Sequence, residues 1–167
     1  MADPHIQSPM DIWDYLTVII YRTGFVIATL SVALLPYYPR AELGILLAAS
    51  CCASSLHIYL KQFRLLLQMA TWTALILFVF GFPNLALDGA FVTLGGLCFK
   101  EYYCFRIPGL NAQSVFFALL WLCLQAHFMI GVQILSLIIA ALLLLLSIQK
   151  WRMPLHFDIG DKRKYEV

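Results

Sequence analysis

The chain has 167 residues, of which 62% are apolar and 12% charged, with a net charge of +2 and a mean hydropathy of +0.85. Soluble domains average roughly 45–50% apolar and about 25% charged residues, so this composition excludes an ordinary soluble protein. It predicts an integral membrane protein whose partners are membrane lipids and other membrane proteins, with no role for nucleic acid.

Six apolar segments are long enough to cross a bilayer, because a spanning helix needs roughly 20 residues. They cover residues 12–35, 41–60, 65–82, 89–105, 112–130 and 132–149, and a basic C-terminal tail follows at 150–167. We therefore expect an all-α fold, a polytopic membrane helix bundle with six transmembrane helices in a single domain over residues 1–167. The first segment has no basic flank and no small-residue cleavage site, which favours a retained helix over a signal peptide.

The positive charges predict the orientation of this bundle. With six spans, nine of the eleven Lys and Arg residues fall on one side of the membrane, Arg40 falls on the other and Arg22 lies within a span. The nine are Lys61, Arg64, Lys100, Arg106, Lys150, Arg152, Lys162, Arg163 and Lys164. Because Lys and Arg accumulate on the cytoplasmic side, both termini are predicted to be cytoplasmic, or stromal in a photosynthetic membrane. The protein is thus expected in a bacterial inner membrane or a thylakoid membrane.

Arg22 is the most informative single residue, since an ionised side chain within a span costs about 2.5–3.5 kcal/mol and needs a partner. Its expected partner is Glu101, which lies at a similar depth in the fourth segment. If Arg22 reaches toward the inner surface, Asp11 or Asp14 takes that place. A direct contact with a ligand is the third interpretation.

The segment GLCFKEYYCFRIPGL holds the densest polar cluster of the chain, at the inner boundary of the fourth span. Its members are Lys100, Glu101, Tyr102, Tyr103 and Arg106. One interpretation is an interfacial collar of cations and tyrosines. The other is a site for an anionic or headgroup-bearing ligand, completed by His57 and Arg22.

Small residues align on two of the predicted helices and favour close helix packing. They are Gly44 and Ala48 on the second segment and Gly89 and Gly96 on the fourth. Adjacent Gly95 and Gly96 leave open whether the fourth helix is continuous or broken.

The histidines and cysteines suggest no shared cofactor. His57 and His127 are predicted near opposite membrane surfaces, so we expect no bound cofactor, with a single pigment or haem at either residue as the alternative. All five cysteines lie in or beside apolar segments without CxxC spacing, and no metal site is expected. They are read as small buried apolar residues, or as a meeting of Cys51 or Cys52 with Cys98.

The segment GAFVTLGGLCFKEYYCFR and the tail FDIGDKRKY resemble a family of predicted integral membrane proteins of unknown function, found in photosynthetic organisms and some other bacteria. The resemblance covers nearly the whole chain. It implies a multi-helix membrane domain, brings no established catalytic residues, and draws attention to Gly96, Cys98, Lys100 and Glu101.

Three functions remain open from the sequence. The preferred one is an accessory or assembly subunit of a larger membrane complex, including a photosynthetic one, because short loops and small-residue faces accompany no catalytic constellation. The second is a small transporter or channel whose polar path includes Arg22, Lys100 and Glu101. The third is a membrane enzyme acting on a lipid or isoprenoid.

Overall fold

The computed structural model describes residues 9–160 and Lys162, and within these residues the regular structure is entirely helical. Arg163 and Lys164, which the sequence places on the cytoplasmic side, lie outside the described part of the chain. The elements are α1 (Ile12–Leu34), α2 (Ala41–Ser54), α3 (Lys61–Val79), α4 (Pro83–Phe105), the 3-10 turn η1 (Leu110–Ala112), α5 (Gln113–Gln125), α6 (Met129–Arg152) and α7 (His156–Ile159).

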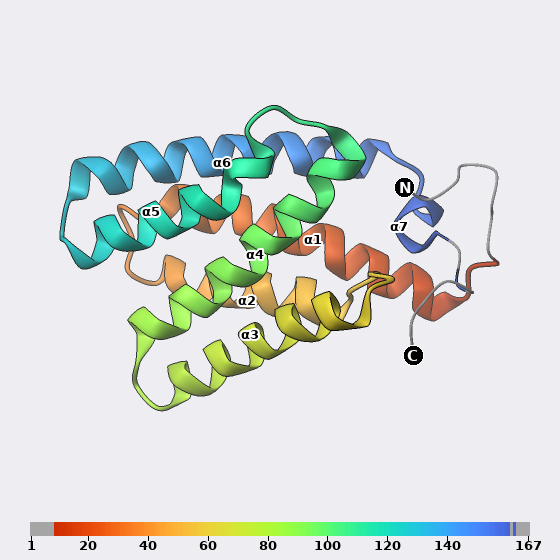
Figure 1. The fold of residues 1–167 in the computed structure, drawn as a ribbon, viewed down its shortest axis with the longest axis horizontal. Helices are drawn as coiled ribbons and strands as arrows, with labels where there is room; N and C mark the ends of the chain where they lie inside the picture. The colour runs from red at the N-terminus through yellow and green to blue at the C-terminus, as the bar shows by residue number, and fades with distance from the viewer. Residues whose placement is uncertain (1–8, 161, 163–167) are drawn as a thin grey trace.

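The six long helices run back and forth along the long axis of the molecule (Figure 1). The α1–α2, α3–α4 and α5–α6 connections gather at one end. The start of α3, the ends of α4 and α6, and α7 lie toward the other end. We call it the basic end because Lys61 begins α3, Lys100 lies in the last two turns of α4 and Arg152 ends α6. After α4 the chain turns back, so α5 begins well short of the basic end.

The protein is a polytopic helical membrane protein. Three helices, α1, α3 and α6, are long and apolar enough to cross a bilayer, and shorter apolar helices cover Ala41–Ser54 and Leu110–Gln125. At a rise of roughly 1.5 Å per residue, the 14 residues of α2 extend only about 21 Å, less than a hydrocarbon core of about 30 Å.

Local chemistry explains where several helices begin and end. Asp11 and Asp14 form a reciprocal capping box at the start of α1, with both hydrogen bonds at 2.9 Å. Pro83 occupies the first turn of α4, where its missing N–H costs nothing. The predicted boundaries differ most at the second segment, because α2 ends at Ser54 and His57 therefore lies in the α2–α3 connection. The fourth helix is one continuous α-helix through Gly95 and Gly96.

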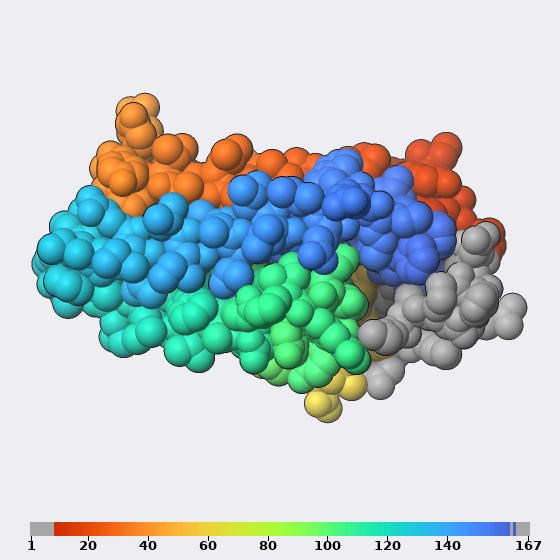
Figure 2. All heavy atoms as spheres, turned by 90° about the horizontal axis from the view of Figure 1, so that it is seen from above, coloured from red at the N-terminus to blue at the C-terminus, as the bar shows by residue number. Residues whose placement is uncertain are grey.

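The core forms mainly where α1 meets α2 and α6 and where α4 packs against α2. Phe25, Ile45, Leu94 and Ile139 are fully buried there. Figure 2 shows α6 lying along the length of α1 on one face of the molecule. Helix α3 is peripheral and buries only Leu67, Thr71 and Ala74.

The small residues pack helices of this chain against one another. A Cβ on Gly44 would come within 2.1 Å of Ser31 Oγ on α1, and one on Gly89 within 2.9 Å of the Ala70 carbonyl oxygen on α3. Gly96 adjoins Leu67 of α3 in the same way, and Ala48 is fully buried. These four residues therefore lie where helices of the same chain pack closely together.

Candidate functional site

Arg22 lies at the crossing of α1 with the segment that follows α6. Its Nε donates to Asp158 Oδ2 at 2.6 Å, and its two terminal nitrogens donate to the carbonyl oxygens of Met153 (2.7 Å) and Pro154 (3.0 Å). The Arg22 side chain is 1% exposed and that of Asp158 is 3% exposed. Because those carbonyls follow the last turn of α6, Arg22 also caps the negative end of that helix dipole.

Lys150 joins this ion pair to a second carboxylate. Its Nζ contacts Asp158 Oδ1 and lies 3.2 Å from Glu101 Oε2. Glu101 Oε1 accepts from the Tyr21 hydroxyl at 2.6 Å and from Lys100 Nζ at 3.0 Å. The Lys150 ammonium also lies 4.8 Å from the centre of the Tyr21 ring, a cation–π distance.

We call Tyr21, Arg22, Lys100, Glu101, Lys150 and Asp158 the ionic cluster. Two buried cations, Arg22 and Lys150, face two buried carboxylates, and each carboxylate oxygen has a donor. Such balance matters because an unpaired charge in a dry interior costs several kcal/mol or more. The Lys100 side chain, 24% exposed, adds one positive charge at the rim of the cluster.

The predicted Arg22–Glu101 ion pair is wrong. In the structure Arg22 forms an ion pair with Asp158, and Glu101 forms ion pairs with Lys100 and Lys150. Asp11 and Asp14, the alternative partners, cap α1, and Asp14 pairs with Lys162. Arg22, Lys100 and Glu101 are nevertheless parts of the same cluster, as the ligand-site interpretation required.

Sequence reasoning missed Tyr21, Lys150 and Asp158. The sequence places Lys150 and Asp158 in the basic C-terminal tail, and Tyr21 carries no signal beyond its position beside Arg22. One signal was available: three cations near one end of the bundle need more than one carboxylate, and the tail supplies Asp158.

His57 lies beside the cluster but outside it. Its Nδ1 is 3.0 Å from the Ser55 carbonyl oxygen and its Nε2 is 3.4 Å from Thr17 Oγ1. Burial lowers the pKa of His57, and the nearby Lys100 ammonium lowers it further. On the exposed edge, the hydrogen bond to Asp14 raises the pKa of Lys162.

The other candidate residues lie apart from the cluster. Arg106 is exposed and ends α4 in a left-handed conformation, with φ of 50°. His127 lies in the α5–α6 connection, at the end of the molecule opposite His57. The five cysteines are free thiols, and a pigment or haem at either histidine stays a prediction. Within the described residues no three His, Cys, Asp or Glu side chains are grouped as metal ligands.

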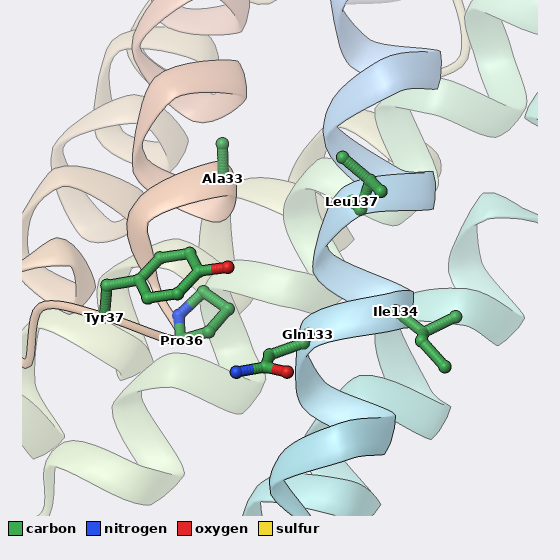
Figure 3. A pocket seen from close by; sticks show the side chains of 6 residues that line it. All are labelled: Ala33, Pro36, Tyr37, Gln133, Ile134 and Leu137. Carbon is green, nitrogen blue, oxygen red and sulfur yellow. The ribbon is translucent and has the colours of Figure 1, made fainter.

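Two hollows open on the sides of the bundle. The first, of about 230 Å³, lies between the end of α1 and the start of α6 and is lined by Ala33, Pro36, Tyr37, Gln133, Ile134 and Leu137 (Figure 3). The second, of about 260 Å³, lies over α4 between α3 and α5. It is lined by Phe63, Leu66, Leu67, Asp88, Phe91, Val92, Gly96, Ser114, Phe117 and Ala118. Neither hollow includes a member of the ionic cluster.

Comparison with known proteins gives a family and one close relative. Residues 42–167 match the family described as "Uncharacterized integral membrane protein (DUF2301)". A protein of Haemophilus influenzae (strain Rd), described as "Uncharacterized protein", is 63% identical over 168 residues, covering 100% of both chains. Neither match bears on photosynthetic organisms, and no solved structure matches this chain. The match to most of the chain means that it belongs to the DUF2301 family of integral membrane proteins.

Proposed function

We propose that this protein is an accessory subunit of a larger membrane complex and binds a transmembrane helix of a partner protein in the hollow between α3, α4 and α5. We call this hollow the α4 groove. The observation that carries the proposal is Asp88, an exposed carboxylate in an otherwise largely apolar groove. The bacterial relative favours the inner membrane over the thylakoid as the location.

An unpaired carboxylate within a membrane span costs free energy, and a partner that pairs with Asp88 would offset that cost. It lies five residues after Pro83, so about 7–8 Å along α4 from its start. Among the described residues, none forms an ion pair or hydrogen bond with its carboxylate. Acidic side chains within a span commonly face protein or water and find a partner there. A basic or amide side chain on a docked helix supplies that partner.

The groove also has the shape of a helix-packing site. Its floor is α4, and its walls are the peripheral helix α3 and the short helix α5. Ser114 on the α5 wall offers a hydroxyl, and Ala118 is small, so a second helix approaches closely. A volume of about 260 Å³ accommodates a few side chains of such a helix rather than a whole lipid.

The transporter alternative has less support. Arg22, Lys100 and Glu101 lie together, but toward the opposite end the space between α1, α2 and α6 is filled by buried Ala28, Val32 and Ile45. A polar path would need that apolar core to open. The enzyme alternative requires a lipid-sized cleft beside Glu101, and both described hollows lie elsewhere.

Site-specific photo-crosslinking in native membranes tests the proposal. A photoreactive residue replaces Val92 in the groove, and the matched control replaces Leu137, an exposed residue of α6 on another face. The expected result is an adduct of defined mass from Val92 and none from Leu137. The adduct should weaken with Asp88→Asn, disappear with Asp88→Lys, and return when a basic residue of the captured helix is changed to Asp.

Lipid adducts alone at Val92 would contradict the proposal. So would a protein adduct whose yield does not respond to Asp88→Lys, because the carboxylate would then have no part in recognition.

A further inference from the structure

The segment that follows α6 supplies the three acceptors of Arg22 described above. Residues 153–160, which we call the C-terminal strap, cross α1 and include the four-residue helix α7. Met153, Pro154 and Asp158 all accept from Arg22, and Asp158 also contacts Lys150. The strap thus inserts one carboxylate between two buried cations.

Removing that carboxylate changes the charge of the cluster. Arg22, Lys100 and Lys150 would then face Glu101 alone, an excess of two positive charges. Buried cations need an anion, and a guanidinium fork fits a carboxylate or phosphate especially well. The Lys150 ammonium adds a point charge at the other oxygen of the same carboxylate.

We infer that Arg22 and Lys150 form a binding site for a carboxylate or phosphate group, and that Asp158 fills this site in the structure as an internal substitute for the ligand. The inference is independent of the α4 groove. In this inference the C-terminal strap can leave the site, and the two cations that bind the anion belong to α1 and α6.

The positions of the two carboxylates explain why Asp158, rather than Glu101, is the exchangeable one. Glu101 is fixed on a 23-residue helix and is held by Tyr21, Lys100 and Lys150. Asp158 belongs to a four-residue helix that packs on α1, and most of the strap is half-buried or exposed. Only Ile159 and Gly160 at its far end are buried.

The anion has two sources that share this chemistry. Ions dissolved in water reach the basic end, where the cluster lies, and so do the headgroups of anionic lipids. Lys100, with a quarter of its side chain exposed, marks the rim through which either would enter.

Anion rescue of a strap variant tests the inference. Asp158→Ala is purified in maltoside detergent, and its Tm is measured with added acetate, phosphate, phosphatidylglycerol or phosphatidylcholine, at ionic strength matched with chloride. The expected result is a lowered Tm that an anion restores in a saturable way, while the wild-type Tm stays unchanged. Asp158→Asn, which keeps the size of the side chain, is titrated in parallel in case Asp158→Ala does not fold.

The choice of added compound identifies the source of the anion. Rescue by acetate or phosphate assigns a soluble anion, and rescue by phosphatidylglycerol but not phosphatidylcholine assigns a lipid headgroup. The same titration on Asp158→Asn with Arg22→Gln should show no rescue. Equal rescue without Arg22, or no saturable rescue of either single variant by any anion, would overturn the inference and leave Asp158 as a structural latch.

Discussion

At the scale of single residues, the guanidinium of Arg22 links three parts of the chain, because it pairs with Asp158, caps α6 and lies on α1. Arg22→Leu alone should therefore cost about 3–5 kcal/mol, the usual loss when one partner of a buried pair is removed. Arg22→Leu with Asp158→Leu should recover part of that loss, because Lys150 keeps Glu101 as its partner. Thermal unfolding in detergent measures both variants.

The control for this prediction is Arg22→Leu with Glu101→Leu. The second change removes the Glu101 carboxylate that Lys100 and Lys150 share and leaves the Tyr21 hydroxyl without its acceptor. The double variant should therefore be less stable than Arg22→Leu alone. If this double variant were instead more stable than Arg22→Leu alone, that result would support the Arg22–Glu101 ion pair expected from depth alone.

His57 gives a pH dependence with a definite sign. Burial and the Lys100 ammonium hold its folded pKa below the ordinary value of 6.5, so below that pH the unfolded chain binds a proton that the folded chain rejects. The contribution of His57 is complete above pH 6.5 and is lost as the pH falls from 6.5 toward the folded pKa. Unfolding temperatures measured between about pH 7.5 and about pH 5.5 should decline less for His57→Gln than for wild type. An identical decline in both would refute the assignment.

The residues of the ionic cluster show what a single sequence conveys about a site. Depth along the predicted helices correctly brought Arg22 near Lys100 and Glu101, because helical rise fixes depth. It could not reveal that Asp158 lies within 2.6 Å of Arg22, 136 residues away, because a polar tail is expected to stay in water. Lateral pairing depends on which helices are neighbours, and hydropathy contains no such information.

At the scale of elements, two helices end in the same way with different residues. In both, the residue after the cap has positive φ: Gly81 after α3 (84°) and His127 after α5 (53°). Each turn has both hydrogen bonds of a Schellman motif. The Phe82 N–H donates to the Leu77 carbonyl oxygen and the Phe128 N–H to that of Cys123, each at 2.9 Å. The Gly81 N–H donates to the Phe78 carbonyl oxygen and the His127 N–H to that of Leu124, each at 3.1 Å. His127 therefore ends α5 through its backbone conformation, a role that does not depend on its imidazole.

Exchanging the residue types at these two turns should change stability in opposite directions. Gly81→Ala meets no atom within 4 Å, so its expected cost of about 1 kcal/mol comes from the left-handed backbone alone. His127→Gly should stabilise by up to about 1 kcal/mol, because glycine adopts this conformation without strain. Tm values of the two variants check the signs. A destabilised His127→Gly would mean that the imidazole makes a contact worth more than the strain.

The element boundaries show where hydropathy works and where it stops. All six apolar segments contain a helix, since a run of apolar residues is long enough to locate one. The predicted second segment runs to residue 60, yet α2 ends at Ser54, and the apolar residues Leu56, Ile58 and Leu60 lie in the connection that follows. Hydropathy records burial or lipid contact and is insensitive to the backbone conformation of apolar residues in a connection.

At the scale of the whole molecule, the bundle separates its charges by end. In the described part of the chain, seven Lys and Arg residues lie toward the basic end: Lys61, Arg64, Lys100, Arg106, Lys150, Arg152 and Lys162. Arg40 lies at the other end, in the α1–α2 connection. The return of the chain at three connections on that end agrees with an even number of crossings, with the short helices α2 and α5 packed among the longer ones.

This arrangement predicts that the basic end is cytoplasmic. Positive residues in short loops are retained on the cytoplasmic side, so Tyr38 in the α1–α2 connection and Arg152 at the end of α6 should be reached from opposite sides. The five natural cysteines are first replaced by Ala or Ser, and Tyr38→Cys or Arg152→Cys is added. A membrane-impermeant maleimide should label Tyr38→Cys in intact cells and label Arg152→Cys only after the membrane is disrupted. Labelling of both variants in intact cells would exclude the six-crossing topology, because six crossings place five, an odd number, between Tyr38 and Arg152 and so put the two residues on opposite sides.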